Sequence, residues 1–183
     1  MNASLPRRCC HASERWAEIA RRYFAGHGPA RLADLAWWSG LTIADANAAI
    51  AAAGSALEEV TGNGVRTWLV PSKAPAPARA TRPVLHLLPN YDELLVAYKL
   101  RDVGLDPELG RRVGPRSTLF ANHVVVRDGM VIGDWRRLPA KAGVEVALRL
   151  LAKLTRAEET ALAVAVERHR RFLGCPVTVT RSS

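Results

Sequence analysis

Five side chains in the second half of the sequence have types that could bind a polyanion. They are Arg127, Trp135, Arg136, Arg137 and Lys141. The cationic groups suit contacts to phosphates, and an aromatic neighbour suits insertion into a minor groove. We expect them along one edge of a basic hairpin that binds DNA. The alternative is that Trp135 belongs to the core and the arginines form a solvated edge that resists aggregation.

Signatures of common catalytic sites are missing from the sequence. It contains no GxxxxGK[ST] phosphate loop, no GxGxxG, no HExxH and no GxSxG. Asp92 and Glu93 are neighbouring carboxylates, but adjacent helical residues point about 100° apart. They are better suited to the first turn of a helix, where acidic side chains complement the helix dipole. We therefore expect no catalytic residue and no cofactor.

Cysteine and histidine are sparse and scattered. Cys9, Cys10 and His11 are consecutive, and neighbouring residues rarely converge on one metal ion, so no metal site is expected. Unpaired thiols suit a reducing compartment. No secretory signal is visible, and the longest uncharged stretch, Ala46 to Leu57, is too short to span a bilayer. We expect a cytoplasmic protein that does not enter membranes.

Positive charge is unevenly distributed. The chain of 183 residues has a formal net charge of +9, which favours a polyanionic partner such as duplex DNA. Residues 27–70 have a net charge of −2, whereas residues 119–183 have a net charge of +5. A helix expected at 43–54 contains no Lys or Arg and offers only Asp45 and Asn47 to a nucleic acid. The basic surface is therefore expected in the C-terminal half.

The first half of the chain is predicted to be three helices followed by a hairpin, after a basic lead-in at residues 1–12. Apolar residues recur at helical spacing from Ser13 to Phe24, and a second helix fits 32–39. Thr42 to Asp45 has the form of a capping box that opens the third helix. Strands are expected at 57–60 and 65–70, with Gly62-Asn63-Gly64 between them. This order predicts a winged helix over residues 13–71.

The second half is predicted to be rich in strands, after a Pro/Ala linker at residues 72–83. Strands are expected at 84–88, 124–127, 130–133, 144–150 and 177–180, and short helices at 91–98 and 105–114. A full capping box at Thr155 to Glu158 opens a long helix that Gly174 closes. Residues 84–183 thus form a β-rich domain with a long C-terminal helix, and the fold class is α+β.

Three groups of segments, in this order, carry a resemblance to a known family. They are Gly28-Pro29-Ala30 with Leu32 to Leu41; His86 to Pro89 with Tyr91-Asp92-Glu93 and Tyr98 to Arg101; and Val126 to Gly129 with Val131 to Arg137. From about residue 14 to residue 180 the chain resembles the winged helix DNA-binding domain-containing family, which includes the AlkZ-like bacterial DNA glycosylases.

The resemblance implies a DNA-binding surface and a barrel-like C-terminal domain. Members of the family are about twice this length and remove bulky alkylated or crosslinked bases. Their catalytic element is a Gln-x-Gln or similar motif in an N-terminal winged helix, and this sequence contains no glutamine. No catalytic residue is therefore carried over, and the chain is expected to be a truncated, non-catalytic member.

Three functions remain open from the sequence. The first is a non-catalytic module that binds duplex DNA with sensitivity to salt. The second is a glycosylase whose catalytic segment comes from elsewhere. The third is a scaffold that binds a protein partner instead of DNA, through an apolar face where Trp16, Trp37 and Trp38 are candidates.

Overall fold

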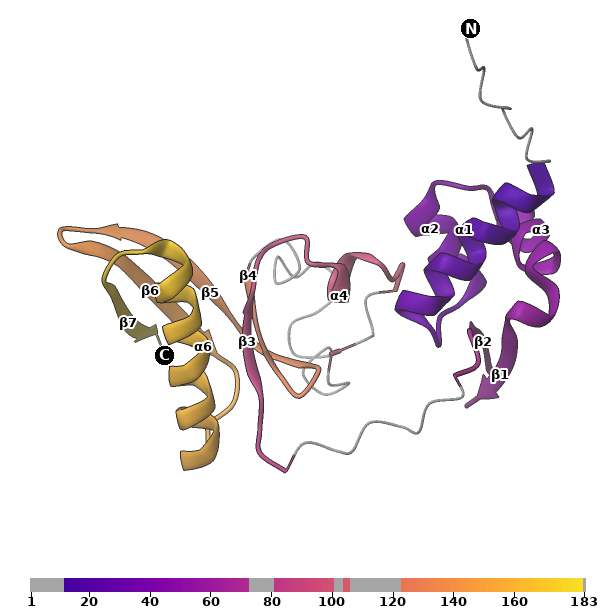
Figure 1. The fold of residues 1–183 in the computed structure, drawn as a ribbon. Helices are drawn as coiled ribbons and strands as arrows, with labels where there is room; N and C mark the ends of the chain where they lie inside the picture. Colours follow the sequence, from indigo (N-terminus) through magenta and orange to yellow (C-terminus); the bar gives the residue numbers. More distant parts are fainter. Residues whose placement is uncertain (1–11, 73–80, 101–103, 106–122, 183) are drawn as a thin grey trace, which may run out of the picture. The chain divides into compact units, whose positions relative to one another are not determined.

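The computed structural model describes residues 12–72, 81–100, 104–105 and 123–182 (Figure 1). The chain divides into two compact units. The first, called here the N-terminal unit, is Met1–Pro75 with Ala97–Lys99, and the second, the C-terminal unit, is Ala76–Val96 with Leu100–Ser183. The fold is a mixture of helices with two sheets, as the α+β prediction requires.

The N-terminal unit begins with three helices, as predicted. They are α1 (Ala12–His27), α2 (Leu32–Ser39) and α3 (Ile43–Ala53), and a 3-10 turn η1 (Gly54–Ala56) follows. The side chain of Thr42 accepts a hydrogen bond from the backbone N–H of Asp45, which starts α3. Gly40 ends α2 in the left-handed conformation, where a residue without Cβ has no steric penalty.

A hairpin completes this unit. Strands β1 (Glu58–Gly62) and β2 (Val65–Leu69) pair antiparallel, and Asn63-Gly64 supply the positive φ angles of the turn. Ala30 and Trp68 exchange two backbone hydrogen bonds, which attach the hairpin to the loop between α1 and α2. Three helices and a hairpin in this order match the layout expected for a winged helix.

The carboxylate of Asp34 holds together parts of the N-terminal unit that are distant in sequence. Asp34 is 3% exposed. Its Oδ2 accepts the backbone N–H of Arg31 at 2.9 Å, and its Oδ1 accepts the backbone N–H of Lys99 at 2.9 Å. A buried carboxylate is stable only when such donors replace water. Asp34 therefore ties the start of α2 to the segment Ala97–Lys99.

Two tyrosines attach the same segment. The hydroxyl of Tyr23 donates to the carbonyl oxygen of Ala97, and the hydroxyl of Tyr98 donates to the carbonyl oxygen of His27. These contacts explain why the predicted helix at 91–98 is shorter than expected. In the structure α4 covers only Glu93–Val96, because the next residues bond to the N-terminal unit instead of continuing the helix.

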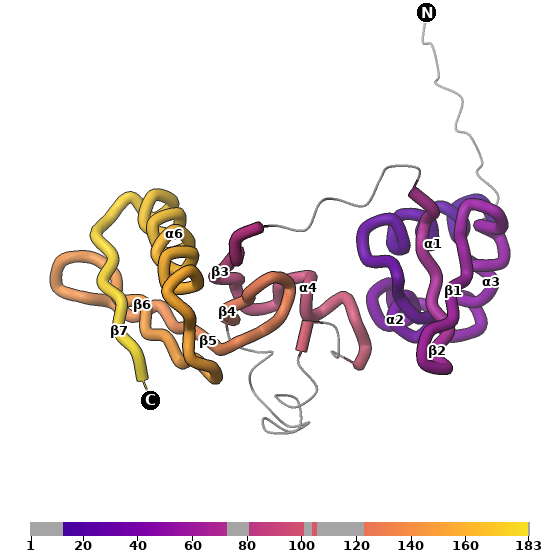
Figure 2. Tube along the Cα trace, turned by 90° about the horizontal axis from the view of Figure 1, so that it is seen from below, coloured from indigo at the N-terminus to yellow at the C-terminus, as the bar shows by residue number. Residues whose placement is uncertain are grey.

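The C-terminal unit is built on a five-stranded sheet (Figure 2). Its strands, in spatial order, are β3 (Leu85–Leu88), β4 (His123–Arg127), β5 (Met130–Ala140), β6 (Gly143–Leu150) and β7 (Val177–Ser182). The first four pair antiparallel. Strand β7 pairs parallel with β6, because the chain crosses over through the helix α6 (Arg156–Leu173) before it returns. The capping box at Thr155 and the left-handed Gly174 bound α6 as predicted.

Strand β5 differs most from the prediction. It continues beyond residue 133, where the sequence analysis ended it, and its second half forms a further hairpin with β6. Gly133 permits this pairing, since a Cβ at that position would lie 2.3 Å from the carbonyl oxygen of Arg149. The two halves of β5 thus belong to two different hairpins.

The sheet has an apolar cluster on each face. One cluster, on the α6 face, contains Leu85, Val125, Ile132, Trp135, Val146, Leu148 and Leu162. The other contains Leu95 of α4 with Val124, Val126 and Val131. Within the described residues β3 and β7 are free edges that do not pair with each other. The sheet formed by the described strands is therefore open, with β3 and β7 at opposite edges.

Some predictions lie outside the described residues. Residues 1–11, 73–80 and 106–122 are not described. They include nearly all of the basic lead-in, most of the linker, and nearly all of the helix expected at 105–114. Among the helices that the structure describes, none is both long and apolar enough to cross a lipid bilayer.

The Asp34 contacts generate a stability prediction. Changing Asp34 to Ala leaves the backbone N–H groups of Arg31 and Lys99 without their acceptor, and such buried donors cost about 1–3 kcal/mol each. We expect a loss of about 2–4 kcal/mol in the free energy of unfolding of the N-terminal unit, measured by urea denaturation. Asp45 to Ala is the control, since it removes a partly exposed carboxylate at a helix start and should cost about 1 kcal/mol or less. Equal losses would contradict this account.

Candidate nucleic-acid interface

Arg127 is the last residue of β4, at the turn between β4 and β5. Its Nη1 lies 2.8 Å from Oε1 of Glu158 in the first turn of α6. Arg136 lies six residues beyond Met130, the partner of Arg127, and this separation corresponds to about 20 Å along a strand. Arg127 thus does not share one edge with the other arginines, and its charge is already paired.

Trp135 lies in the core and is almost fully buried. It is 4% exposed, and its Nε1 donates to the carbonyl oxygen of Leu88 at 3.0 Å. Of the two interpretations that the sequence left open, the one that places Trp135 in the core therefore describes its position. Its role is to fix the orientation of the residues that follow it on β5.

Arg136, Arg137 and Lys141 lie on the second half of the β5–β6 hairpin, and all three are exposed. Successive strand residues point to opposite faces of a sheet. Because Trp135 faces α6, Arg137 lies on the α6 face and Arg136 on the other face. Lys141 is in the turn that joins the two strands. We call these three residues the hairpin cations.

Internal ion pairs separate the basic side chains into two groups. Of the eleven Lys and Arg residues in 119–183, five form ion pairs: Arg127, Arg149, Arg170, Arg171 and Arg181. The other six have no ion pair within the described chain: Arg136, Arg137, Lys141, Lys153, Arg156 and Arg168. Half of the unpaired group are therefore the hairpin cations, where positive charge is available to a ligand.

Two histidines flank Trp135, and the sequence analysis missed them. The ring of His123 stacks on Trp135 at a centroid distance of 4.5 Å, and the ring of His169 meets it edge-on at 5.0 Å. Burial, and then the charge of Arg137, lower the pKa of both imidazoles, and His123 adds to the effect on His169. The Nε2 of His169 is buried and has no hydrogen-bond partner among the described residues. No sequence signal connects them, because they come from β4 and α6.

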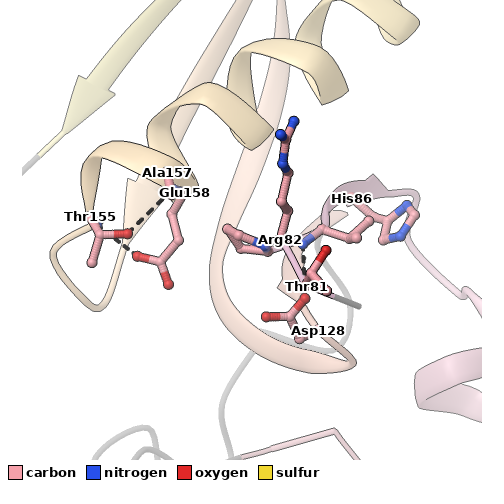
Figure 3. Close-up of a pocket in the computed structure, with 9 residues that line it drawn as sticks. Thr81, Arg82, His86, Asp128, Thr155, Ala157 and Glu158 are labelled. Atoms are coloured by element: carbon pink, nitrogen blue, oxygen red, sulfur yellow. Dashed lines mark hydrogen bonds between the residues drawn. The ribbon is translucent and has the colours of Figure 1, made fainter. Parts of the chain in front are cut away.

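A hollow of about 750 Å³ lies at the opposite end of β5, beside the β4–β5 turn (Figure 3). Arg82 lies in it, with Thr155 and Glu158 on one side and His86 on the other. The carboxylate of Asp128 accepts the backbone N–H of Val84, and that of Glu158 is bound to Arg127 and to the backbone N–H of Thr155. Both carboxylates thus make contacts that stabilise the fold.

Helix α3 presents no cation, as the sequence indicated. Its exposed residues are Ile43, Ala44, Asn47, Ala51 and Ala52. Such a face cannot contact phosphates strongly. Across the described residues, no group of three or more His, Cys, Asp or Glu is placed to hold a metal ion.

The fold and surface define a two-unit α+β protein with the helix and hairpin order of a winged helix and a basic hairpin in its second unit. A family model for DNA glycosylase AlkZ-like proteins matches residues 3–172. The chain belongs to the AlkZ-like DNA glycosylase family.

A solved structure has the same fold. The Streptomyces sahachiroi DNA glycosylase AlkZ is similar with a TM-score of 0.69 and 22% sequence identity, over 97% of this chain. The match covers 48% of AlkZ, so the chain spans about half the length of that protein. No curated protein sequence matches the chain.

The histidines around Trp135 predict how stability depends on pH. Their pKa values are lower in the folded protein than the usual 6.5, so the unfolded chain binds more protons below that pH. The stabilisation is present above about pH 6.5 and is lost as the pH falls through the folded pKa values. We expect the free energy of unfolding, from urea denaturation, to decrease between pH 7.5 and pH 5.

The variant His169→Leu tests the origin of this decrease. It removes one imidazole while keeping an apolar side chain against Trp135, so the decrease should become smaller. Carboxylates also contribute at the acid end of this range. Arginine partners lower the pKa of Glu18 and Glu167 to about 2 in the folded protein, so the unfolded chain binds more protons at these groups as the pH falls toward 4.5. This contribution is the same in the wild type and the variant, so the difference between them reports the histidine. An unchanged pH dependence in the variant would contradict the assignment.

Proposed function

We propose that this chain is the DNA-binding part of an AlkZ-like protein and that the β5–β6 hairpin contacts the phosphates of duplex DNA. One observation carries the proposal: the hairpin cations are exposed and form no ion pair with any residue that the structure describes, in a member of a DNA glycosylase family. Phosphate contacts of this kind supply most sequence-independent affinity for DNA. We also propose a bacterial source and the cytoplasm as the location, where the DNA of a bacterium lies.

The position of the cations at the end of the sheet supports this contact. Arg136 and Arg137 point to opposite faces of the sheet, and Lys141 lies in the turn between β5 and β6. Strand β6 also pairs with β7 from Val144 to Arg149, so the three cations lie at one end of a three-stranded part of the sheet. Phosphates that approach this end can contact all three of them.

We further propose that the N-terminal unit is a winged helix that acts as a scaffold. Its third helix, the usual reader of base edges, exposes mainly alanine and no cation. Strong sequence preference would need donors and acceptors on that face. Binding is therefore expected to tolerate different DNA sequences and to depend on salt.

Removal of Arg136 and Arg137 tests the interface. We expect Arg136→Ala with Arg137→Ala to weaken binding of a short labelled duplex about tenfold or more near 0.15 M salt. The slope of log affinity against log salt should also fall by about two, since two phosphate contacts are lost. Fluorescence anisotropy across a salt series measures both quantities.

Arg170→Ala with Arg171→Ala is the matched control. It also removes two adjacent arginines, but both are bound to Glu167 on α6 and are not part of the hairpin. The control should leave the salt slope nearly unchanged. Equal effects of the two double variants would show that only net charge matters. Absence of binding at low salt would instead favour a protein-interaction scaffold.

We propose that the chain does not cleave glycosidic bonds by itself. In the family it resembles, catalysis belongs to a Gln-x-Gln or similar motif, and the sequence has no glutamine. The hollow beside the β4–β5 turn offers no free carboxylate in its place. The alternative is a glycosylase for bulky alkylated or crosslinked bases, completed by a catalytic segment from another source.

A base-release assay separates these two possibilities. The purified chain, incubated with an alkylated duplex and then treated with alkali, should produce no more strand breaks than the duplex alone. Alkali cleaves at abasic sites, so breaks on a denaturing gel report base release. Breaks that depend on the protein would contradict the non-catalytic proposal and establish a catalytic group within these residues.

A further inference from the structure

Tyr91 combines an uncommon backbone conformation with an exposed aromatic ring. It lies between β3 and α4, its φ is +58°, and its side chain is 70% exposed. The other described non-glycine residues with positive φ are Asn63 and Asp128, both in hairpin turns. Asn and Asp tolerate this conformation, whereas a bulky aromatic residue there is an outlier.

The other tyrosines show what this side chain does when it serves the fold. Tyr23 is 1% exposed and Tyr98 is 9% exposed, and each hydroxyl donates to a backbone carbonyl. The hydroxyl of Tyr91 has no such bond within the described part of the chain. Its ring therefore contributes little to folding, although its backbone is held in an unfavourable conformation.

Hydrogen bonds from two directions fix the loop that carries Tyr91. Before it, the backbone N–H of Asn90 donates to Nδ1 of His123 at 2.8 Å, and Nε1 of Trp135 donates to the carbonyl of Leu88. After it, Oδ1 of Asp92 accepts the backbone N–H of Leu94 at 3.0 Å and starts α4. The loop thus presents the ring in a defined place.

Strand register puts this loop at the same end of the sheet as Arg136 and Arg137. Leu88, the last residue of β3, pairs with Val124, and His123 pairs with Trp135. The end of β3 and the start of β4 therefore lie at the same end of the sheet, and β5 continues beyond them there. Tyr91 follows β3 at that end. Strands β3 and β5 are separated by two strand spacings, or about 10 Å. An aromatic ring and two guanidiniums that form no ion pair with described residues therefore lie within reach of a few nucleotides.

We propose that Tyr91 stacks on an unpaired base of DNA whose phosphates are bound by the hairpin cations. The proposal rests on the DNA-binding function proposed above and adds a preference for duplexes with an unstacked base. Aromatic rings beside cationic grooves bind single nucleotides in this way, without regard to sequence. A fully paired duplex offers no free base face, so it would gain nothing from the ring.

Two labelled duplexes test the proposal, one fully paired and one with a single 2-aminopurine opposite an abasic site. We expect the wild-type chain to bind the second about tenfold more tightly. Tyr91→Phe keeps the ring and should keep the preference. Tyr91→Gly should bind both duplexes equally, and 2-aminopurine fluorescence should be quenched by the wild type and Tyr91→Phe but not by Tyr91→Gly.

Thermal unfolding of Tyr91→Gly separates binding from folding. Glycine adopts a positive φ without steric penalty, so the melting temperature should be unchanged or higher. If Tyr91→Gly is as stable as the wild type and has lost the preference for the duplex with the unstacked base, the proposal is supported. A lower melting temperature would show that the ring packs on the fold, and would overturn it.

The remaining outcomes distinguish this inference from the proposed function. Arg136→Ala with Arg137→Ala should weaken binding to both duplexes, whereas Tyr91→Gly should change only the preference. Equal binding of both duplexes by the wild type, or a preference that survives in Tyr91→Gly, overturns the role of Tyr91 and leaves DNA binding intact. No binding of either duplex would overturn the proposed function, and this inference with it.

Discussion

The burial of Trp135 is the constraint on which the C-terminal unit depends. Its ring lies between the sheet and α6, with the imidazoles of His123 and His169 against it. Because side chains alternate along a strand, this single buried ring decides that Arg137 lies on the α6 face and Arg136 on the opposite face. Its indole N–H also holds the end of β3, from which the Tyr91 loop departs. Core packing thus sets the geometry of the proposed interface.

Net charge alone describes this protein poorly. The excess of +9 suggests a uniformly basic surface, but internal ion pairs use many of the arginines. Glu158 of α6 binds Arg127 of β4, and Glu159 of α6 binds Arg181 of β7. These two ion pairs attach the helix to two different strands of the sheet. Of the six cations in residues 119–183 that form no ion pair with a described residue, three lie on the β5–β6 hairpin. Internal ion pairs therefore determine which cations are available to bind DNA, as much as the number of Lys and Arg residues does.

The family relationship and the local chemistry address different questions. Membership of the AlkZ-like family makes DNA the expected partner, but the match covers only 48% of the Streptomyces sahachiroi enzyme. Within the described residues, the carboxylates beside the β4–β5 turn are all engaged in the fold. The proposed DNA binding therefore rests on the family and on the exposed hairpin cations.

The sequence by itself determined the local elements. Several local elements follow from short-range rules, and the structure contains them: the capping box at Thr155, the Asn63-Gly64 and Asp128-Gly129 turns, and the order of helices and strands. At Thr42 the expected capping box is only half formed: the Thr42 side chain caps α3, but the Asp45 carboxylate accepts from the Thr42 hydroxyl. The three cations of the β5–β6 hairpin were also identifiable from sequence. Only the tertiary structure decided that β5 continues to Ala140, that Arg127 is paired with Glu158, that Ala97–Lys99 binds Asp34, and that His123 and His169 flank Trp135. These contacts join residues far apart in the chain, where the partner depends on strand register and helix packing and no local pattern specifies it.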